Sequence, residues 1–171
     1  MKQAILLVVV AVLGLPFHLS AQAGQANTVQ QAILGTWKLV SYIREDVPSG
    51  AKSDVMGDHP SGYLNYGSDG RMMVMIVGSD RKKPAGAIAT PDEAEALIKS
   101  MLAYAGTYTI DIETKTVTHH IDISWDQART GTDNVRSYKL EGNRLMLSTE
   151  PSADPATGQK TVRTLIWERL K

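Results

Sequence analysis

The stretch GTWKLVSY, residues 35–42, decides the fold of this chain. Its aromatic and β-branched side chains are typical of a β-strand. Gly35 stands two residues before Trp37, so the backbone can bend tightly where the chain enters a sheet, and a buried indole can seal one end of the core. We therefore expect the first strand of a small closed sheet, running to about Arg44, in which Gly35 and Trp37 are structural.

Length, composition and charge limit the classes of protein to which this chain can belong. The chain has 171 residues, of which 43% are hydrophobic, and this suits one domain with a real core. The 18 basic and 18 acidic residues balance, so nothing indicates a nucleic acid or an anionic membrane surface as partner. With no cysteine, the chain has no thiol nucleophile, cysteine-bound zinc or disulfide. No glycine-rich phosphate-binding motif precedes a helix, and we expect no cofactor.

The amino terminus has the layout of a secretory signal peptide. Lys2 precedes an apolar run, residues 4–15, and the small residues Ala21 and Ala23 follow in an A-x-A arrangement. The run is shorter than the roughly 20 residues that a membrane span needs, although an uncleaved anchor is the alternative. We expect a signal peptide at 1–23, with cleavage after Ala21 as the second choice, a flexible leader at 24–31 and one domain at 32–171. The protein would then be periplasmic or secreted, with no stable membrane insertion after cleavage.

Strand patterns separated by turn signals fill most of the chain. The Asp-Gly pair in the turn 67–70 predicts a hairpin of strands 63–66 and 71–77. Five further strands are expected at 107–112, 116–124, 132–141, 144–148 and 160–170. The glycine- and proline-containing segments 45–62, 78–89 and 149–158 are expected to be loops. The fold class is therefore all-β, with about eight antiparallel strands that can close a barrel.

One helix is expected between the third and fourth of these strands. Thr90 is a typical N-cap, Pro91 suits the first helical position, and Glu93 completes a capping box. Apolar residues follow at helical spacing up to Gly106, which we expect to end the helix. This apolar stripe, which consists of Ala94, Leu97, Ile98, Met101 and Ala105, predicts a face packed against the sheet.

Strand alternation selects the residues that face the barrel interior. In the strand 116–124, His119 shares a face with apolar residues and should point inward, whereas His120 should point outward. Two side chains on opposite faces cannot easily share an ion, so no metal site is expected. A set of inward polar side chains could line a pocket for a small molecule, namely Tyr66, Tyr108, His119, Arg136 and Tyr138. The alternative is a packed core in which the polar ends of these side chains reach water at the mouth of the barrel.

Several ordered motifs resemble the bacterial lipocalin-like domain family, and together they cover roughly residues 32–171. They are the stretches at 35–42, 66–72, 106–108, 116–120, 131–136, 145–148 and 167–170. The resemblance implies a calycin-type, up-and-down barrel in which a basic residue of the last strand lies against Trp37. Arg169 is the better match for that residue and Arg163 the second.

Three functional hypotheses follow from the sequence. The first is an exported barrel that binds a small apolar or amphipathic molecule. The second is a cofactor-independent isomerase or cyclase, a class that the resemblance also allows, with His119 as the catalytic proton-transfer residue. The third is a protein-interaction barrel with a filled core that uses the loops 45–62 and 78–89.

Overall fold

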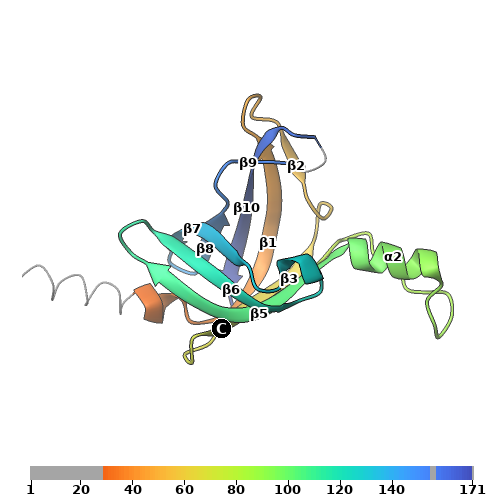
Figure 1. Cartoon of the computed structure of the whole chain (residues 1–171), viewed down its shortest axis with the longest axis horizontal. Helices are drawn as coiled ribbons and strands as arrows, with labels where there is room; N and C mark the ends of the chain where they lie inside the picture. Colours follow the sequence, from red (N-terminus) through yellow and green to blue (C-terminus); the bar gives the residue numbers. More distant parts are fainter. Residues whose placement is uncertain (1–28, 155–156, 171) are drawn as a thin grey trace, which may run out of the picture.

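The computed structural model describes residues 29–154 and 157–170, and within them eight long antiparallel strands close into a barrel (Figure 1). The sheet order is β1-β3-β4-β5-β6-β7-β8-β10, and β10 pairs again with β1. This confirms the all-β, up-and-down barrel of about eight antiparallel strands expected from the sequence. The eight strands are β1 (Gly35–Asp46), β3 (Ser61–Tyr66), β4 (Arg71–Val77), β5 (Met101–Asp111), β6 (Thr116–Ser124), β7 (Asp133–Glu141), β8 (Arg144–Ser148) and β10 (Lys160–Arg169).

Two short strands extend the sheet beyond the barrel. β2 (Lys52–Asp54) pairs with the end of β1, and β9 (Ser152–Ala153) pairs with the start of β10. The sequence placed both within loops, and that part of the prediction is wrong. All five side chains of β2 and β9 are exposed, so these strands show no apolar alternation and depend on backbone pairing alone. A short 3-10 helix, η1 (Gln127–Arg129), connects β6 to β7.

One end of the barrel is closed around Trp37. Residues 29–33 are helical, and the carbonyl of Ile33 accepts a 2.8 Å hydrogen bond from Trp37 Nε1. The Arg169 guanidinium carbon lies 4.1 Å from the centre of the indole ring, and Arg169 also donates to the carbonyls of Leu34 and Ala32. A single arginine therefore joins the last strand to the first strand and to the segment before it.

Gly35 is required by this arrangement. Its φ angle is +108°, a region that side-chain-bearing residues avoid, and an added Cβ would lie 3.3 Å from Arg169 Nη1. The glycine thus lets the chain turn into β1 while the arginine stays close. The signal peptide expected at 1–23 and most of the leader expected at 24–31 lie outside the described residues, whereas residues 29–31 belong to the helical turn.

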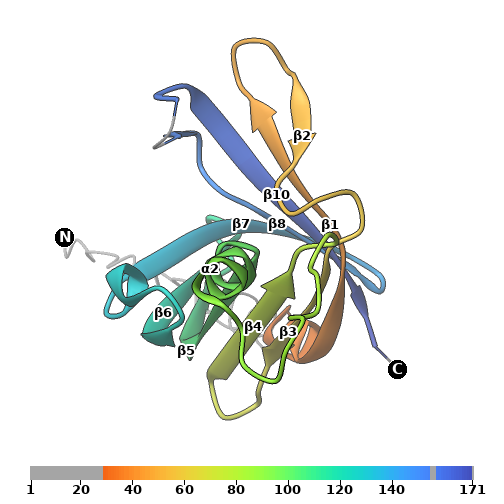
Figure 2. The same cartoon turned by 90° about the vertical axis from the view of Figure 1, so that its right-hand side faces the viewer.

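The helix α2 (Pro91–Lys99) begins where the sequence indicates and ends earlier. The Thr90 hydroxyl accepts from the backbone N–H of Glu93, whose carboxylate accepts from the Thr90 N–H, so the capping box is confirmed. α2 follows β4, the third of the long strands, as expected. The helix stops at Lys99, however, and no side chain of α2 is buried. The expected packing of its apolar stripe against the sheet is wrong, and α2 projects away from the barrel (Figures 1 and 2).

Gly106 lies within β5 instead of ending a helix. It stands beside an irregularity in the β5–β6 register, where an added Cβ would come within 1.8 Å of the His120 carbonyl oxygen. Glycine is therefore needed for the two backbones to approach each other. Within the described residues, no helix is long and apolar enough to cross a membrane.

Trp37→Ala should lower the free energy of unfolding by about 3–5 kcal/mol, because it removes a fully buried indole together with its hydrogen bond and its contact with Arg169. Urea unfolding followed by circular dichroism measures the change. Trp125→Ala is the matched control, since Trp125 is partly exposed and its removal should cost much less. Equal stability of the Trp37 variant and the parent protein would contradict the role of Trp37 in closing the barrel.

Candidate functional site

A buried imidazole bridges two tyrosines inside the barrel. His119 Nε2 lies 2.7 Å from the Tyr66 hydroxyl, and His119 Nδ1 lies 2.9 Å from the Tyr104 hydroxyl. The three side chains come from β6, β3 and β5, and His119 is 2% exposed. His120 points outward, where its Nδ1 lies 2.8 Å from Asp133 Oδ1. The inward and outward orientations expected for the two histidines are therefore confirmed.

The protonation states of these groups follow from their burial. Burial, and next the positive charge of Arg136, lower the pKa of His119 from its ordinary 6.5 to about 3. Burial also raises the pKa of Tyr66 well above its usual value and raises that of Tyr104. At neutral pH the imidazole and both phenols are thus uncharged. His119 carries one N–H, so one tyrosine donates to the ring and the other accepts from it. The accepting tyrosine keeps its own O–H for another acceptor.

The inner face of β7 adds two polar groups beside this chain of hydrogen bonds. Asn134 is the cross-strand partner of His119, and Arg136 is the partner of Val117, so both share the inward face. The Asn134 side chain interacts with the Tyr104 hydroxyl, where its hydrogen bond lowers the pKa of that phenol, although Nδ2 forms no hydrogen bond of regular geometry within the described residues. Arg136 Nη1 donates to the Val135 carbonyl, and no carboxylate within the described residues forms an ion pair with it.

Burial differs from one side of the barrel interior to the other. The inward residues of β6 are buried, whereas those of β7 are only half-buried, namely Asn134, Arg136, Tyr138 and Leu140. Solvent therefore reaches the inner face of the sheet along β7. In this region Arg136, which has no carboxylate partner among the described residues, lies near the Tyr66–His119–Tyr104 chain of hydrogen bonds.

The structure brings together part of the pocket set expected from the sequence. The rings of Tyr66 and Tyr108 are 4.7 Å apart, and Tyr66 contacts His119. The Tyr108 hydroxyl is directed elsewhere, since it donates to the Gly67 carbonyl in the β3–β4 turn. The charge of Arg136 lowers the pKa of both Tyr66 and His119, which indicates that it lies near them. Among the described contacts, no hydrogen bond or ring contact connects Tyr138 to this group.

Two residues of the site were missed by the sequence reasoning. Tyr104 was placed in the helix expected before Gly106, although residues 102–110 alternate between apolar and small or polar side chains with the period of a strand. That alternation was the signal for Tyr104. Asn134 shares its face with Arg136 and Tyr138, and the same alternation could have found it. In the described residues, no group of three or more His, Asp or Glu side chains converges for a metal ion.

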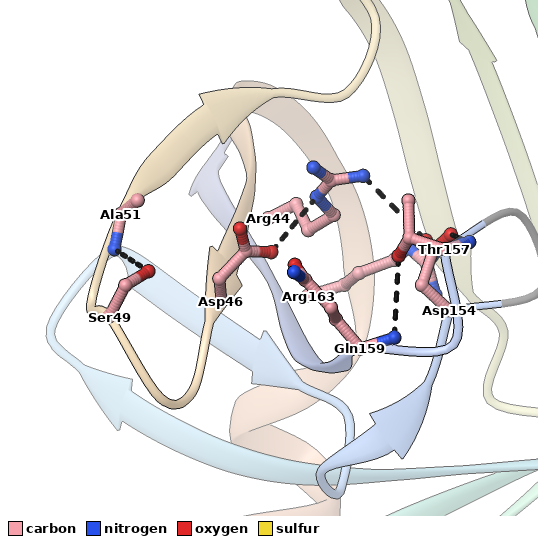
Figure 3. Close-up of polar contacts among 8 residues, drawn as sticks. All are labelled: Arg44, Asp46, Ser49, Ala51, Asp154, Thr157, Gln159 and Arg163. Carbon is pink, nitrogen blue, oxygen red and sulfur yellow. Dashed lines mark hydrogen bonds and ion pairs between the residues drawn. The ribbon is translucent and has the colours of Figure 1, made fainter.

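A second polar cluster joins β1 and β10 at the ends remote from Trp37 (Figure 3). Arg163 Nη2 lies 2.8 Å from the buried Asp154 carboxylate, and Arg44 Nη1 lies 3.7 Å from the same oxygen. Arg44 Nε is 3.6 Å from Asp46. Arg163, the second choice for the contact with Trp37, therefore belongs to this cluster. The cluster holds the β9 segment against β1 and β10, which are the first and last strands of the barrel.

Comparison with known proteins bears on the family and not on the ligand. The model of the lipocalin-like domain family matches residues 34–170, which is most of the chain and includes every strand of the barrel. No curated protein matches the chain significantly. The family match and the closed antiparallel barrel agree with the resemblance inferred from the motifs. The chain is therefore a member of the lipocalin-like domain family.

Proposed function

We propose that the protein binds a small amphipathic molecule inside the barrel, with the polar end of the molecule against β7. A lipocalin-like barrel supports ligand binding in general. The residues of this chain add the chemistry, because the interior presents apolar walls and a limited set of polar groups at one place. Such a combination is typical of small-molecule sites.

The observation that carries the proposal is the inward-facing guanidinium of Arg136, which has no carboxylate partner among the described residues. A buried donor without a partner costs about 1–3 kcal/mol, so proteins pair such groups with their own atoms, with water or with a ligand. Trp167 Nε1, on the inward face of β10, is a buried donor without a partner among the described residues. Both groups are donors, which favours a ligand that presents acceptor oxygens.

The charge of Arg136 narrows the ligand further. An inward-facing guanidinium without a carboxylate partner favours an anionic or strongly polar acceptor group, which it can bind in a bidentate manner. The accepting tyrosine of the Tyr66–His119–Tyr104 chain has one O–H to offer to the same group. We therefore propose a ligand with an apolar body and a carboxylate or carbonyl end.

A positioning role for His119 fits the structure better than proton transfer. Its pKa of about 3 leaves the imidazole neutral and weakly basic at neutral pH, and both ring nitrogens are occupied by tyrosine hydroxyls. The imidazole fixes the two phenols, and the isomerase alternative would need a group that gains and loses a proton near pH 7.

Export is the second part of the proposal. The signal-peptide pattern of residues 1–23 supports a periplasmic or secreted protein.

If residues 1–23 are cleaved, the protein recovered from the periplasm or medium should begin at Gly24. Expression of the full chain in a bacterial host, cell fractionation and intact-mass measurement test this. Accumulation of the unprocessed chain in the cytoplasm would contradict the proposal.

A fluorescent medium-chain fatty acid should bind the protein more tightly than the same chain ending in an alcohol, because only the acid pairs with Arg136. Arg136→Gln should weaken binding of the acid by about tenfold or more and leave the alcohol unaffected. Fluorescence titration measures both. Arg144→Gln is the matched control, since Arg144 is exposed at the start of β8.

Two outcomes would overturn the ligand proposal. One is the absence of binding by either probe together with native mass spectra that show no co-purified small molecule. The other is equal weakening by the Arg136 and Arg144 variants, which would assign the effect to surface charge rather than to the barrel interior.

His119 should remain neutral in the folded protein down to about pH 4, and its ring resonances in NMR spectra should report this. The unfolded chain takes up the imidazole proton below about pH 6.5, whereas the folded chain does so only near pH 3. The contribution of His119 to stability is therefore complete above pH 6.5 and is lost as the pH falls toward 3. His119→Gln should remove this part of the pH dependence and His120→Gln should not. A His119 resonance that titrates near pH 6.5 would contradict the buried, bridging imidazole.

A further inference from the structure

An apolar groove crosses the outer face of the sheet, opposite the interior site. Its floor is formed by Ala103 and Ala105 of β5. Met73 and Met75 of β4 form one wall, and Ile123, with the following Trp125, forms the other. Cross-strand pairing aligns them, since Met75 pairs with Ala103, Met73 with Ala105, and Ala105 with Ile123. The groove has a volume of about 640 Å³, and Met73 and Ile123 are 61% and 66% exposed.

A second apolar surface lies on the projecting segment 79–99, here called the arm, which comprises the loop 79–90 and α2. Ile88 at the end of the loop is 88% exposed, Ile98 on the helix is also exposed, and no α2 side chain is buried. A hollow of about 650 Å³ lies between α2, the loop of the arm and the segment with Val55 and Met56 that follows β2. Figure 1 shows the arm standing clear of the sheet, and Figure 2 views it along its length.

The free-standing state is unfavourable for such an arm. A nine-residue helix is below the roughly 12–15 residues at which isolated helices become even marginally stable in water. Its capping box helps by about 1 kcal/mol, but most helices gain their stability by packing an apolar face. The exposed isoleucines of the arm therefore indicate a surface that is covered in the working form of the protein.

The groove has the dimensions of a helix. It extends past β4 to Thr36, Tyr63 and Asn65, and between the outward rows of β4 and β6 it spans two strand spacings, which is about 9.6 Å. An α-helix with side chains is about 10 Å across. The alanine floor allows a helix to approach the sheet, and the methionines can adapt to its side chains. The groove therefore suits a short amphipathic helix better than a flat protein surface.

We propose that the occupant of the groove is the arm of a second copy of this chain, in a reciprocal two-fold dimer. The arm leads directly into β5, whose Ala103 and Ala105 form the groove floor. A two-fold axis that passes beside the chain near Ser100 reverses the direction of the arm and lays it along the β5 of the partner. The same operation lays the partner's arm along the first copy, so each groove receives one helix.

The size of the resulting contact supports a dimer. Stable interfaces bury roughly 1,200–2,000 Å², which favours the arrangement that covers the most apolar surface. A reciprocal exchange buries two arms and two grooves at once. One arm bound to one groove would bury only half of this area. The second copy is thus favoured because it covers both unpartnered surfaces at once. The interface lies on the outside of the barrel and does not depend on the proposed interior ligand.

Sedimentation equilibrium of the protein recovered from cells that express the full chain tests the proposal. We expect a dimer at micromolar concentration. Ile98→Asp on the arm and Met73→Asp in the groove should each raise the dimer dissociation constant by about tenfold or more. Met146→Asp is the matched control, because Met146 is an outward methionine in the middle of β8, away from the groove. Circular dichroism verifies that all variants remain folded.

Mixing the variants makes the test specific for reciprocal exchange. The Ile98→Asp protein keeps an intact groove and the Met73→Asp protein keeps an intact arm, so the mixture should form heterodimers more readily than either variant alone forms homodimers.

Three outcomes would overturn the proposal: a monomeric parent protein at 100 micromolar, equal weakening of the dimer by Met73→Asp and Met146→Asp, or loss of binding to phosphatidylglycerol vesicles as the only effect of Ile98→Asp. The last would assign the arm to a lipid surface.

Discussion

The pairing of the first strand with the last holds this barrel together. The ladder runs from Trp37 opposite Arg169 to Asp46 opposite Thr161, and without it the other strands would form an open sheet with two long edges. Each end of the ladder is reinforced by arginine. Arg169 covers the indole and binds the carbonyls that precede β1, whereas Arg163 and Arg44 meet the Asp154 carboxylate at the other end. A protein without cysteine thus fixes its closing strands by packing and by charge.

Much of the fold followed from local patterns in the sequence. Alternation placed His119 inward and His120 outward, the Asp-Gly turn gave the β3–β4 hairpin, and the capping box gave the start of α2. The end of α2 was wrong because Met101 and Ala105 fit a helical stripe and a strand equally well in the sequence. Only the β4–β5 pairing, which is a tertiary contact, decides between them. That error also hid Tyr104, the second partner of His119.

The polar interior illustrates what sequence patterns cannot supply. Alternation can nominate inward-facing residues, but it does not indicate which of them touch. Tyr138 faces inward like Arg136, yet among the described residues only Tyr66 and Tyr104 bond to the imidazole. The contact of Asn134 with Tyr104 depends on the register between β6 and β7, which places Asn134 opposite His119. The chemistry of the site therefore depends on distances across strands rather than on residue types.

The order of the strands also sets how the chain can fold. Every other neighbouring pair of long strands is connected through a segment of modest length, but β1 and β10 are separated in sequence by almost the whole domain. Contacts between residues so far apart in sequence are slow to form, because the entropy of closing a long loop must be overcome first. We therefore expect barrel closure to be the last topological event of folding. Until β10, which carries Trp167 and Arg169, pairs with β1, the strands that follow Gly35 can form hairpins but cannot enclose the barrel interior.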